Sequence, residues 1–459
     1  MEKKNSFFSK FIKVFWYTLF FVVFTITCAM VIFYASGYKI NLKSMKVQKS
    51  GMILIDYRDD GIDILIDGKK ADYVKEKQGF WSESNYIISI LPGKYTIDIK
   101  KQGKKDYVDT LVVDEEKITK IENLILIPEN IQETKLLENE SVSQYCVSEN
   151  GKKIIYKKDG GVFFYNIENE IKKQVAEDSS KYIFEKCIWD SKDERALLYF
   201  ADSASKRFYV FNSENPNGSF FLHDLLSFVP ELNNIYFSYT DSNIVVGISK
   251  NEIYRINIEG KSIDIIESNV NQTFYHKGYL FYIKNDEKNL YQLDSSFYSK
   301  DIILEGLELK DDFGIAFIKN RDIYIKNENK IFKINNKNNL ELLEDGVDNI
   351  VTSNRGDGIF YLKGFELWFY SLDKKESVMV SRFSQAINKA ETLNYSYIVH
   401  ASDSSLGMIL ENGQNNQEIF NTSNTITDFR VLEKGKILII QKKEKSFEFS
   451  IIDLEVSNN

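Results

Sequence analysis

A short pattern of apolar and polar positions recurs six times along this 459-residue chain. Each copy reads apolar residue, aromatic residue, any residue, apolar residue and a small polar residue. Alternation of this kind predicts a β-strand, and the terminal Asn, Asp or Ser favours a turn. The copies are VFFYN (162–166), FYVFN (208–212), IYRIN (253–257), LYQLD (290–294), IFKIN (331–335) and LWFYS (367–371).

The spacing of the copies predicts a repeat architecture. Their aromatic positions are 46, 45, 37, 41 and 36 residues apart, an average of 41. A second short strand precedes most copies and a third strand follows several of them. A period near 40 with three or four strands per unit is typical of β-propeller blades, in which each sheet covers the faces of its neighbours. The aromatic positions are Phe163, Tyr209, Tyr254, Tyr291, Phe332 and Trp368.

We therefore expect a seven- or eight-bladed β-propeller over residues 133–455, in a chain that is mainly β. Two weaker units, at 407–423 and 436–454, extend the series, and the last one lacks a fourth strand. The segment ETKLLEN (133–139) can supply that strand and close the ring. In this interpretation, each repeated strand places alternate apolar residues in the cores between blades.

The N-terminal region predicts a membrane anchor. Residues 14–35 form a run of 22 residues without a charge. At about 1.5 Å per residue the run is roughly 33 Å long, enough for a hydrocarbon core of about 30 Å. We expect a cytoplasmic tail at 1–13, a transmembrane helix at 14–35 and a linker at 36–50. A cleaved signal peptide is the alternative, although its apolar region would be shorter.

Lysines near the helix favour a cytoplasmic N-terminus. Lys3, Lys4, Lys10 and Lys13 precede the apolar run, whereas Lys39, Lys43, Lys46 and Lys49 follow it and weaken the contrast. Because large domains translocate largely regardless of their charge, we expect the bulk of the chain to be extracytoplasmic.

Residues 51–128 predict a small antiparallel β-sandwich. Short apolar strands are bounded by Asp and Gly, without helical periodicity. The stretch YIISILPGKYTIDIKKQGKKDY (86–107) predicts a hairpin with a type II turn at Pro92-Gly93. After the turn, Tyr95, Ile97 and Ile99 should form an apolar face.

This region resembles a PEGA domain. The resemblance rests on a strand that ends in a DG turn and on a later stretch similar to pGxYxVxVxkxGY. Gly68, Pro92, Gly93, Tyr95 and Gly103 match the family pattern. The chain departs from it at 58–61, which replaces the family's name-giving tetrapeptide, and at Lys104, where an aromatic residue is usual. The resemblance implies an extracytoplasmic surface module without catalytic residues.

Charge and cysteine content narrow the function classes. The net charge is −8 and lysines are scattered, which argues against a nucleic-acid partner. Of the three cysteines, Cys28 lies in the apolar run. We expect Cys146 and Cys187 to be buried free thiols. A disulfide between them is the alternative, since they occupy similar places in successive units.

The sequence identifies no catalytic, cofactor-binding or metal-ligating residue. His223, His276 and His400 lie in different units without partners at ligand spacing, so we expect packing or surface roles. Gly260-Lys261-Ser262 resembles the end of a phosphate loop but lacks its first glycine, and a β turn is expected. The tripeptide Arg355-Gly356-Asp357 occurs often by chance and is expected in a hairpin turn.

These features predict a membrane-anchored extracytoplasmic scaffold or binding protein, without cofactors, whose propeller presents loops to an envelope protein or cell-envelope glycan. The alternative is a hydrolase or lyase that acts on polysaccharide in the propeller funnel. Two or more Asp, Glu or His side chains converging on the axis would favour the enzyme. A funnel that is uncharged or filled with lysines would exclude it.

Overall fold

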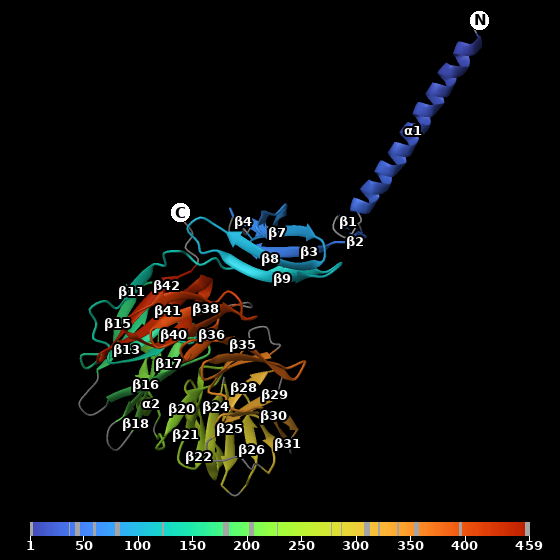
Figure 1. Cartoon of the computed structure of the whole chain (residues 1–459). Coiled ribbons are helices and arrows are strands. Elements are labelled where there is room, and N and C mark those ends of the chain that lie inside the picture. Colours follow the sequence, from blue (N-terminus) through green and yellow to red (C-terminus); the bar gives the residue numbers. More distant parts are fainter. Residues whose placement is uncertain are drawn as a thin grey trace. The chain divides into compact units, whose positions relative to one another are not determined.

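The computed structural model divides the chain into two compact units, Met1–Asn130 and Ile131–Asn459. Figure 1 shows the elements of both units. The structure describes residues 3–454 except 36, 42–45, 58–60, 79–82, 122–123, 178–182, 202–205, 227, 277, 286, 307–312, 320–321, 337–338, 353–357 and 394–396.

Unit 1 begins with the helix α1 (Lys3–Ala35), which extends further toward the N-terminus than the predicted apolar run. Its segment Ile12–Phe33 has a mean hydropathy of 2.1 and is long and apolar enough to cross a membrane, although signal sequences share these properties. The Thr18, Thr25 and Thr27 hydroxyls donate to carbonyls four residues earlier, which satisfies polar groups inside an apolar helix. In the segment expected to be a linker, β1 (Tyr38–Asn41) and β2 (Lys46–Lys49) pair as a hairpin.

Two four-stranded sheets form this part of the chain, with strand orders β10-β3-β7-β6 and β5-β4-β8-β9. The prediction that all strands are antiparallel is wrong at one place, because β10 pairs parallel with β3. Ile53, Ile55, Ile97 and Ile99 are fully buried in this unit. The strands are β3 (Gly51–Tyr57), β4 (Asp63–Ile66), β5 (Lys69–Lys70), β6 (Val74–Gln78), β7 (Glu83–Ile90), β8 (Gly93–Lys100), β9 (Tyr107–Val113) and β10 (Ile118–Ile121).

The predicted hairpin at 86–107 is wrong, because β7 and β8 belong to different sheets. β7 pairs with β3 and β6, whereas β8 pairs with β4 and β9. Gly93 also lacks the positive φ of a type II turn. The Tyr95 ring packs over this residue: a Cβ there would lie 3.3 Å from the ring, whose hydroxyl donates to the Leu91 carbonyl at 2.8 Å. Alternation identified the buried face of each strand but not its neighbour.

Unit 2 is an eight-bladed β-propeller. Within its described residues it contains eight four-stranded antiparallel sheets, which Figure 1 shows arranged around a centre. We number them I to VIII. Sheet I is β12–β15, II is β16–β19, III is β20–β23, IV is β24–β27, V is β28–β31, VI is β32–β35, VII is β36–β39, and VIII is β40–β42 with β11.

The first strands of neighbouring sheets are in contact around the axis, as between sheets I and II and between VI, VII and VIII. The strands and short helices of unit 2 are β11 (Glu133–Leu136), β12 (Gln144–Val147), β13 (Lys153–Lys158), β14 (Gly161–Asn166), β15 (Ile171–Glu177), β16 (Ile183–Trp189), β17 (Arg195–Ala201), β18 (Lys206–Asn212), η1 (Pro216–Gly218), β19 (Phe220–Phe221), α2 (Leu222–Leu225), β20 (Asn234–Phe237), β21 (Ile244–Ile248), β22 (Glu252–Asn257), β23 (Ser262–Ser268), β24 (Val270–His276), β25 (Tyr279–Lys284), β26 (Leu290–Leu293), β27 (Lys300–Leu304), β28 (Phe313–Lys319), β29 (Asp322–Asn327), β30 (Lys330–Asn336), β31 (Asn339–Glu344), β32 (Asn349–Thr352), β33 (Gly358–Lys363), β34 (Glu366–Ser371), β35 (Glu376–Arg382), β36 (Lys389–Thr392), β37 (Tyr397–Ala401), β38 (Ser405–Leu410), β39 (Gln417–Asn421), β40 (Thr425–Val431), η2 (Glu433–Gly435), β41 (Lys436–Lys443) and β42 (Ser446–Asp453).

The ring closes as the sequence predicts. β11 pairs antiparallel with β42, so that a strand from the start of unit 2 completes the sheet built from its end. Thr134 lies opposite Ile451 and Leu136 opposite Phe449.

Each copy of the repeated five-residue pattern lies in the third strand of its sheet. As expected, alternate residues of the copy pack into the cores on the two sides of that sheet. Phe163 packs in the cluster between sheets VIII and I. Its neighbour Phe164 packs between sheets I and II. The terminal polar residue accepts backbone N–H groups of the next turn, as Asn166 does from Glu168 at 3.0 Å. Equivalent acceptors are Asn212, Asn257, Asp294 and Ser371.

A β-bulge marks five of the six copies and also sheet VII. The pairing of third and fourth strands shifts just before the aromatic position, or before Gly407 in sheet VII, which leaves one residue of the fourth strand unpaired. That residue is aliphatic in each sheet. A bulge turns an extra side chain toward one face, and here it packs into or beside an inter-sheet core. The unpaired residues are Val175, Ile266, Ile303, Leu343, Val380 and Ile419.

In two sheets the bulge also positions a carboxylate against the next sheet. Glu267 follows Ile266 and accepts hydrogen bonds from Tyr282 at 2.7 Å and Lys300 at 3.0 Å, both in sheet IV. Lys284 lies 3.3 Å away. Burial raises the pKa of Glu267, but the hydrogen bonds from Tyr282, Lys300 and Lys284 lower it by more, so the pKa lies below its usual range. We call Glu267 and its partners a carboxylate latch.

The latch recurs at two other junctions. Glu344 of sheet V contacts Lys363 of sheet VI at 2.9 Å and accepts from Ser377. At the closing junction Glu140 accepts from Tyr156 at 3.2 Å, and Lys158 and Lys172 are paired with it. These carboxylates tie consecutive sheets together by more than apolar contact.

Replacing Glu267 with Gln should lower the free energy of unfolding at pH 7 by about 2 kcal/mol, because the partly buried Lys284 and the more exposed Lys300 lose this counter-ion. The control Asp264→Asn, which removes an exposed partner of Arg255, should change it by less than about 0.5 kcal/mol. Urea unfolding of both variants measures the difference.

The effect of Glu267→Gln should depend on pH. Because the folded-state pKa of Glu267 is lowered, its contribution is complete above the unfolded-state pKa of about 4.3 and is lost as pH falls through the folded-state pKa. The gap between the wild-type protein and the variant should therefore shrink in acid. A constant gap from pH 7 down to the lowest pH at which the protein folds would contradict the latch.

Candidate functional site

A cavity of about 650 Å³ lies beside the first strands of sheets VI, VII and VIII, at the end where first strands turn into second strands. We call this place the channel mouth. Its lining is partly apolar and partly charged. The lining residues are Glu149, Asn349, Ile350, Val351, Lys389, Ala390, Glu391, Thr392, Leu393, Arg430, Val431, Leu432 and Glu433.

Four charged side chains on two neighbouring strands form a closed quartet. Lys389 and Glu391 alternate on β36, and Asp428 and Arg430 alternate on β40, so each pair lies on one face of its strand. Lys389 Nζ lies 2.5 Å from Asp428 Oδ1 and 2.7 Å from Glu391 Oε1. Arg430 Nη1 lies 2.9 Å from Glu391, and Nη2 lies 3.8 Å from Asp428.

Backbone groups complete the quartet. Lys389 donates to the Phe429 carbonyl at 2.7 Å, and Glu391 Oε2 accepts from the Val431 N–H at 3.0 Å. Two anions and two cations therefore neutralise one another, and both carboxylates are occupied as acceptors. This arrangement suits a rigid wall better than a proton-transfer pair, which needs a carboxylate within reach of substrate.

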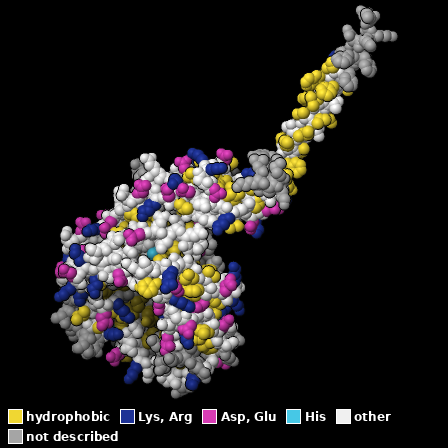
Figure 2. Space-filling view, in the orientation of Figure 1, with side chains coloured by type: hydrophobic (Ala, Val, Ile, Leu, Met, Phe, Trp, Pro, Cys, Tyr) yellow, Lys and Arg dark blue, Asp and Glu magenta, His cyan; other side chains and the backbone are white. Residues whose placement is uncertain are grey.

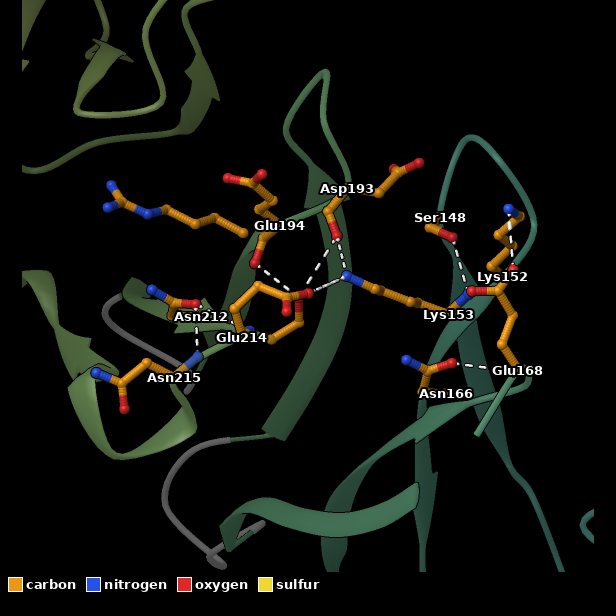
Figure 3. A network of polar contacts seen from close by, with 12 residues as sticks. Ser148, Lys152, Lys153, Asn166, Glu168, Asp193, Glu194, Asn212, Glu214 and Asn215 are labelled. Atoms are coloured by element: carbon orange, nitrogen blue, oxygen red, sulfur yellow. Dashed lines mark hydrogen bonds and ion pairs between the residues drawn. The ribbon is translucent and has the colours of Figure 1, made fainter. Parts of the chain in front are cut away.

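A polar network fixes the turn that brings Glu149 to the channel mouth. The Asp193 carboxylate accepts from the Glu149 and Asn150 N–H groups, each at 3.0 Å. Lys153 donates to the Asp193 carbonyl at 2.9 Å and to Glu214 at 2.8 Å. Figure 3 shows this network, in which Lys153 of sheet I reaches toward Asp193 and Glu214 of sheet II. The turn of sheet I is thus held by sheet II.

Two tyrosines pack together on β20 and β24, the first strands of sheets III and IV. The Tyr236 and Tyr275 rings stack with centroids 4.4 Å apart, and the Tyr275 hydroxyl donates to the Phe237 carbonyl at 3.0 Å. Burial raises the pKa of Tyr275 to about 12, against a backbone hydrogen bond from Gly278, and the negative charge of Glu149 adds to the rise. Tyr239, also close enough to affect Tyr275, is 53% exposed.

Figure 2 shows where hydrophobic and charged side chains lie on the surface. One face of unit 2 is hollowed, with hydrophobic side chains inside the hollow. Basic and acidic side chains are intermingled on the face shown, without a large basic patch.

The prediction of free thiols at Cys146 and Cys187 is wrong, because the two form a disulfide. They lie on β12 and β16, the first strands of sheets I and II, with Cα atoms 5.8 Å apart. Equivalent places in successive sheets become neighbours around the axis. The similar positions of the two residues in their repeats were the signal, and the low number of cysteines hid it.

Two histidines have the expected structural surroundings. His400 is buried, its ring lies 4.5 Å from that of Phe383, and Nε2 lies 3.1 Å from Asn416 Oδ1. It occupies the space opposite Gly407, where a Cβ would lie 2.3 Å from the imidazole. His223 lies on α2, where burial lowers its pKa. His276 ends β24.

The remaining candidate motifs lie elsewhere. Gly260 and Lys261 lie in the predicted turn, with the Gly260 N–H donating to Asn257 at 2.7 Å, and Ser262 begins β23. Arg355-Gly356-Asp357 lies outside the described residues. Among the residues that the structure describes, no group of three His, Cys, Asp or Glu is arranged to hold a metal ion.

No protein-family model matches the chain. No curated protein matches it either. Solved structures similar to it include a eukaryotic initiation factor, at 12% identity over 70% of this chain and 87% of that chain, with a TM-score of 0.49. YCF48 bound to D1 peptide shares 9% identity over 73% and 100%, with a TM-score of 0.41. An oligogalacturonate lyase from Vibrio parahaemolyticus shares 9% identity over 71% and 97%, with a TM-score of 0.38. At these values the likenesses say nothing of function, and the propeller assignment rests on the sheet topology.

Replacing Lys389 with Met should lower the free energy of unfolding by about 3 kcal/mol, because Glu391 and Asp428 would then share Arg430 as their counter-ion. The double variant Lys389→Met, Asp428→Leu should recover part of that loss. Lys374→Met, at an exposed ion pair, is the control with little expected effect. Equal destabilisation by Lys374→Met and Lys389→Met in urea unfolding would contradict a tightly coupled quartet.

Proposed function

We propose that this protein is a single-pass membrane-anchored binding protein whose propeller lies outside the cytoplasm and binds a partner protein or a cell-envelope glycan. The observation that carries the binding role is the channel-mouth cavity. Its wall combines apolar side chains with charges that are already paired. A concave, preformed site of this kind suits recognition.

The disulfide supports the extracytoplasmic location. Disulfides persist in oxidising compartments and are rare in the cytosol. The apolar helix α1 supplies the anchor in this proposal, with residues 1–13 cytoplasmic. The sandwich, which we propose to be a PEGA-like module, serves as a spacer between membrane and propeller.

An enzyme that acts on polysaccharide is the second candidate, and one observation favours it. Glu391 and Asp428 converge beside the channel from neighbouring strands. Their occupation by Lys389 and Arg430 speaks against it. Formation of new reducing ends from purified wall polysaccharide, abolished by Asp428→Asn, would support the enzyme over the binding protein.

Thiol counting tests the location. In protein precipitated from cells with acid and denatured without reductant, a maleimide polymer should modify Cys28 alone. After reduction it should modify all three cysteines. Three modified thiols before reduction would remove the argument for an oxidising compartment.

Partner capture tests the binding role. In-cell cross-linking of the full-length protein, followed by affinity purification and mass spectrometry, should recover a reproducible envelope protein. Retention on purified wall material without a protein would indicate the glycan. Thr392→Trp, which fills the cavity, and the exposed charge change Asn349→Arg should each abolish capture. Lys374→Trp, away from the cavity, should not.

Unfolding midpoints of the variants separate lost binding from lost folding. If both cavity variants fold and still capture the same partner, the channel mouth is not its binding site.

A further inference from the structure

Among the described residues that line the channel mouth, one carboxylate has no cationic partner. Lys389 and Arg430 are paired with Glu391 and Asp428. Glu433 is paired with Lys152 at 3.2 Å, which also contacts Glu168 at 3.0 Å. Glu149 lines the same cavity and is exposed, and among the described residues no cation is paired with it.

Several hydrogen bonds fix the backbone of the turn that carries Glu149. Its own N–H and that of Asn150 bind the Asp193 carboxylate, which is 4% exposed as a residue. Ser148 Oγ donates to Asn150 Oδ1 at 2.8 Å and accepts from the Lys153 N–H at 3.0 Å. The turn that carries this unpaired charge is therefore preorganised, which lowers the entropic cost of binding.

An exposed aromatic ring lies on the same side. Tyr239 belongs to the corresponding turn of sheet III, and its carbonyl accepts from Ser191 at 2.7 Å. A Cβ at Gly278 would lie 2.1 Å from the Tyr239 Cβ, so sheet IV packs closely against this residue. The turns that carry Glu149 and Tyr239 are both bound to the turn of sheet II between them, the first through Asp193 and the second through Ser191. Tyr239 is thus fixed between sheets II and IV while its ring stays half exposed.

We propose that the channel mouth binds a cationic side chain, lysine or arginine, of a partner polypeptide, with Glu149 as its counter-ion and the Tyr239 ring beside it. This inference rests on the proposed binding function and names the partner chemistry. A carboxylate is the natural counter-ion of a basic side chain, and the electron-rich face of an aromatic ring also attracts a cation.

The rest of the cavity agrees with this choice. An anionic ligand would meet Glu149 without finding a free cation, since Lys389, Arg430 and Lys152 are already paired. The apolar side chains of Ile350, Leu393 and Leu432 can cover the methylene groups of a long basic side chain.

Peptide selection tests the inference without a known ligand. A random peptide library displayed on phage is panned against the detergent-solubilised full-length protein, the variant Glu149→Gln and the control Glu433→Gln. Glu433→Gln makes the same charge change at the same rim, at a carboxylate that already has a cationic partner. Peptides selected by the wild-type protein and by Glu433→Gln should be enriched in Lys and Arg, whereas those selected by Glu149→Gln should not.

The best selected peptide then gives a quantitative test. Replacing its basic residue with glutamine, or Glu149 with Gln, should weaken binding about tenfold, and the two changes together should cost little more than either alone. Tyr239→Ala should weaken binding, and Tyr239→Phe should preserve it.

Selected peptides without basic residues, or basic peptides that bind Glu149→Gln as well as wild type, would overturn the inference while leaving a binding propeller. Failure to select any peptide, together with failure to cross-link a partner or to retain wall material, would overturn the proposed function itself.

Discussion

The structure of unit 2 depends on one constraint: a four-stranded sheet with two apolar faces is stable only when other sheets cover both. The strands carry buried side chains on alternate positions toward opposite neighbours, as Phe163 and Phe164 do. Covering every face requires a closed ring, and closure requires that the last sheet borrow β11. The bulges add a further aliphatic side chain to these interfaces, and the latches of Glu140, Glu267 and Glu344 join consecutive sheets through polar contacts.

The periodicity of the sequence predicted most of this architecture. A repeat of about 40 residues with apolar alternation is a property of each sheet alone, so the propeller, its closing strand and the turn-forming Asn166 followed from local pattern. The count of sheets, left at seven or eight, is eight in the described residues. The helix α1 also followed from composition, although it begins at Lys3 and so includes charged residues before the apolar run.

What the sequence did not predict depends on contacts between distant elements. Alternation over 86–107 was correct for the buried face of β8, yet it could not show that β7 and β8 separate into two sheets. The Cys146–Cys187 bond depends on two first strands meeting at the axis. In the sequence, the quartet of Lys389, Glu391, Asp428 and Arg430 consists of two ordinary charged pairs, K-x-E and D-x-R, nearly 40 residues apart. Neither pair alone predicts a site, because the two come into contact only when the fold places β36 beside β40.

At the channel mouth, the same closure assembles neutralised charges into a rigid wall beside Glu149, which is not paired with a cation in the part of the chain that the structure describes. In the proposed function, such a propeller would recognise a partner through groups that the ring holds in place, and its location would decide which partners it meets. Protease protection in cells stripped of their outer layers tests that location most directly, with epitope tags at both ends of the protein. We expect added protease to destroy the C-terminal tag while the N-terminal tag stays protected until the membrane is opened. Protection of the C-terminal tag until the membrane is opened would contradict an extracytoplasmic propeller.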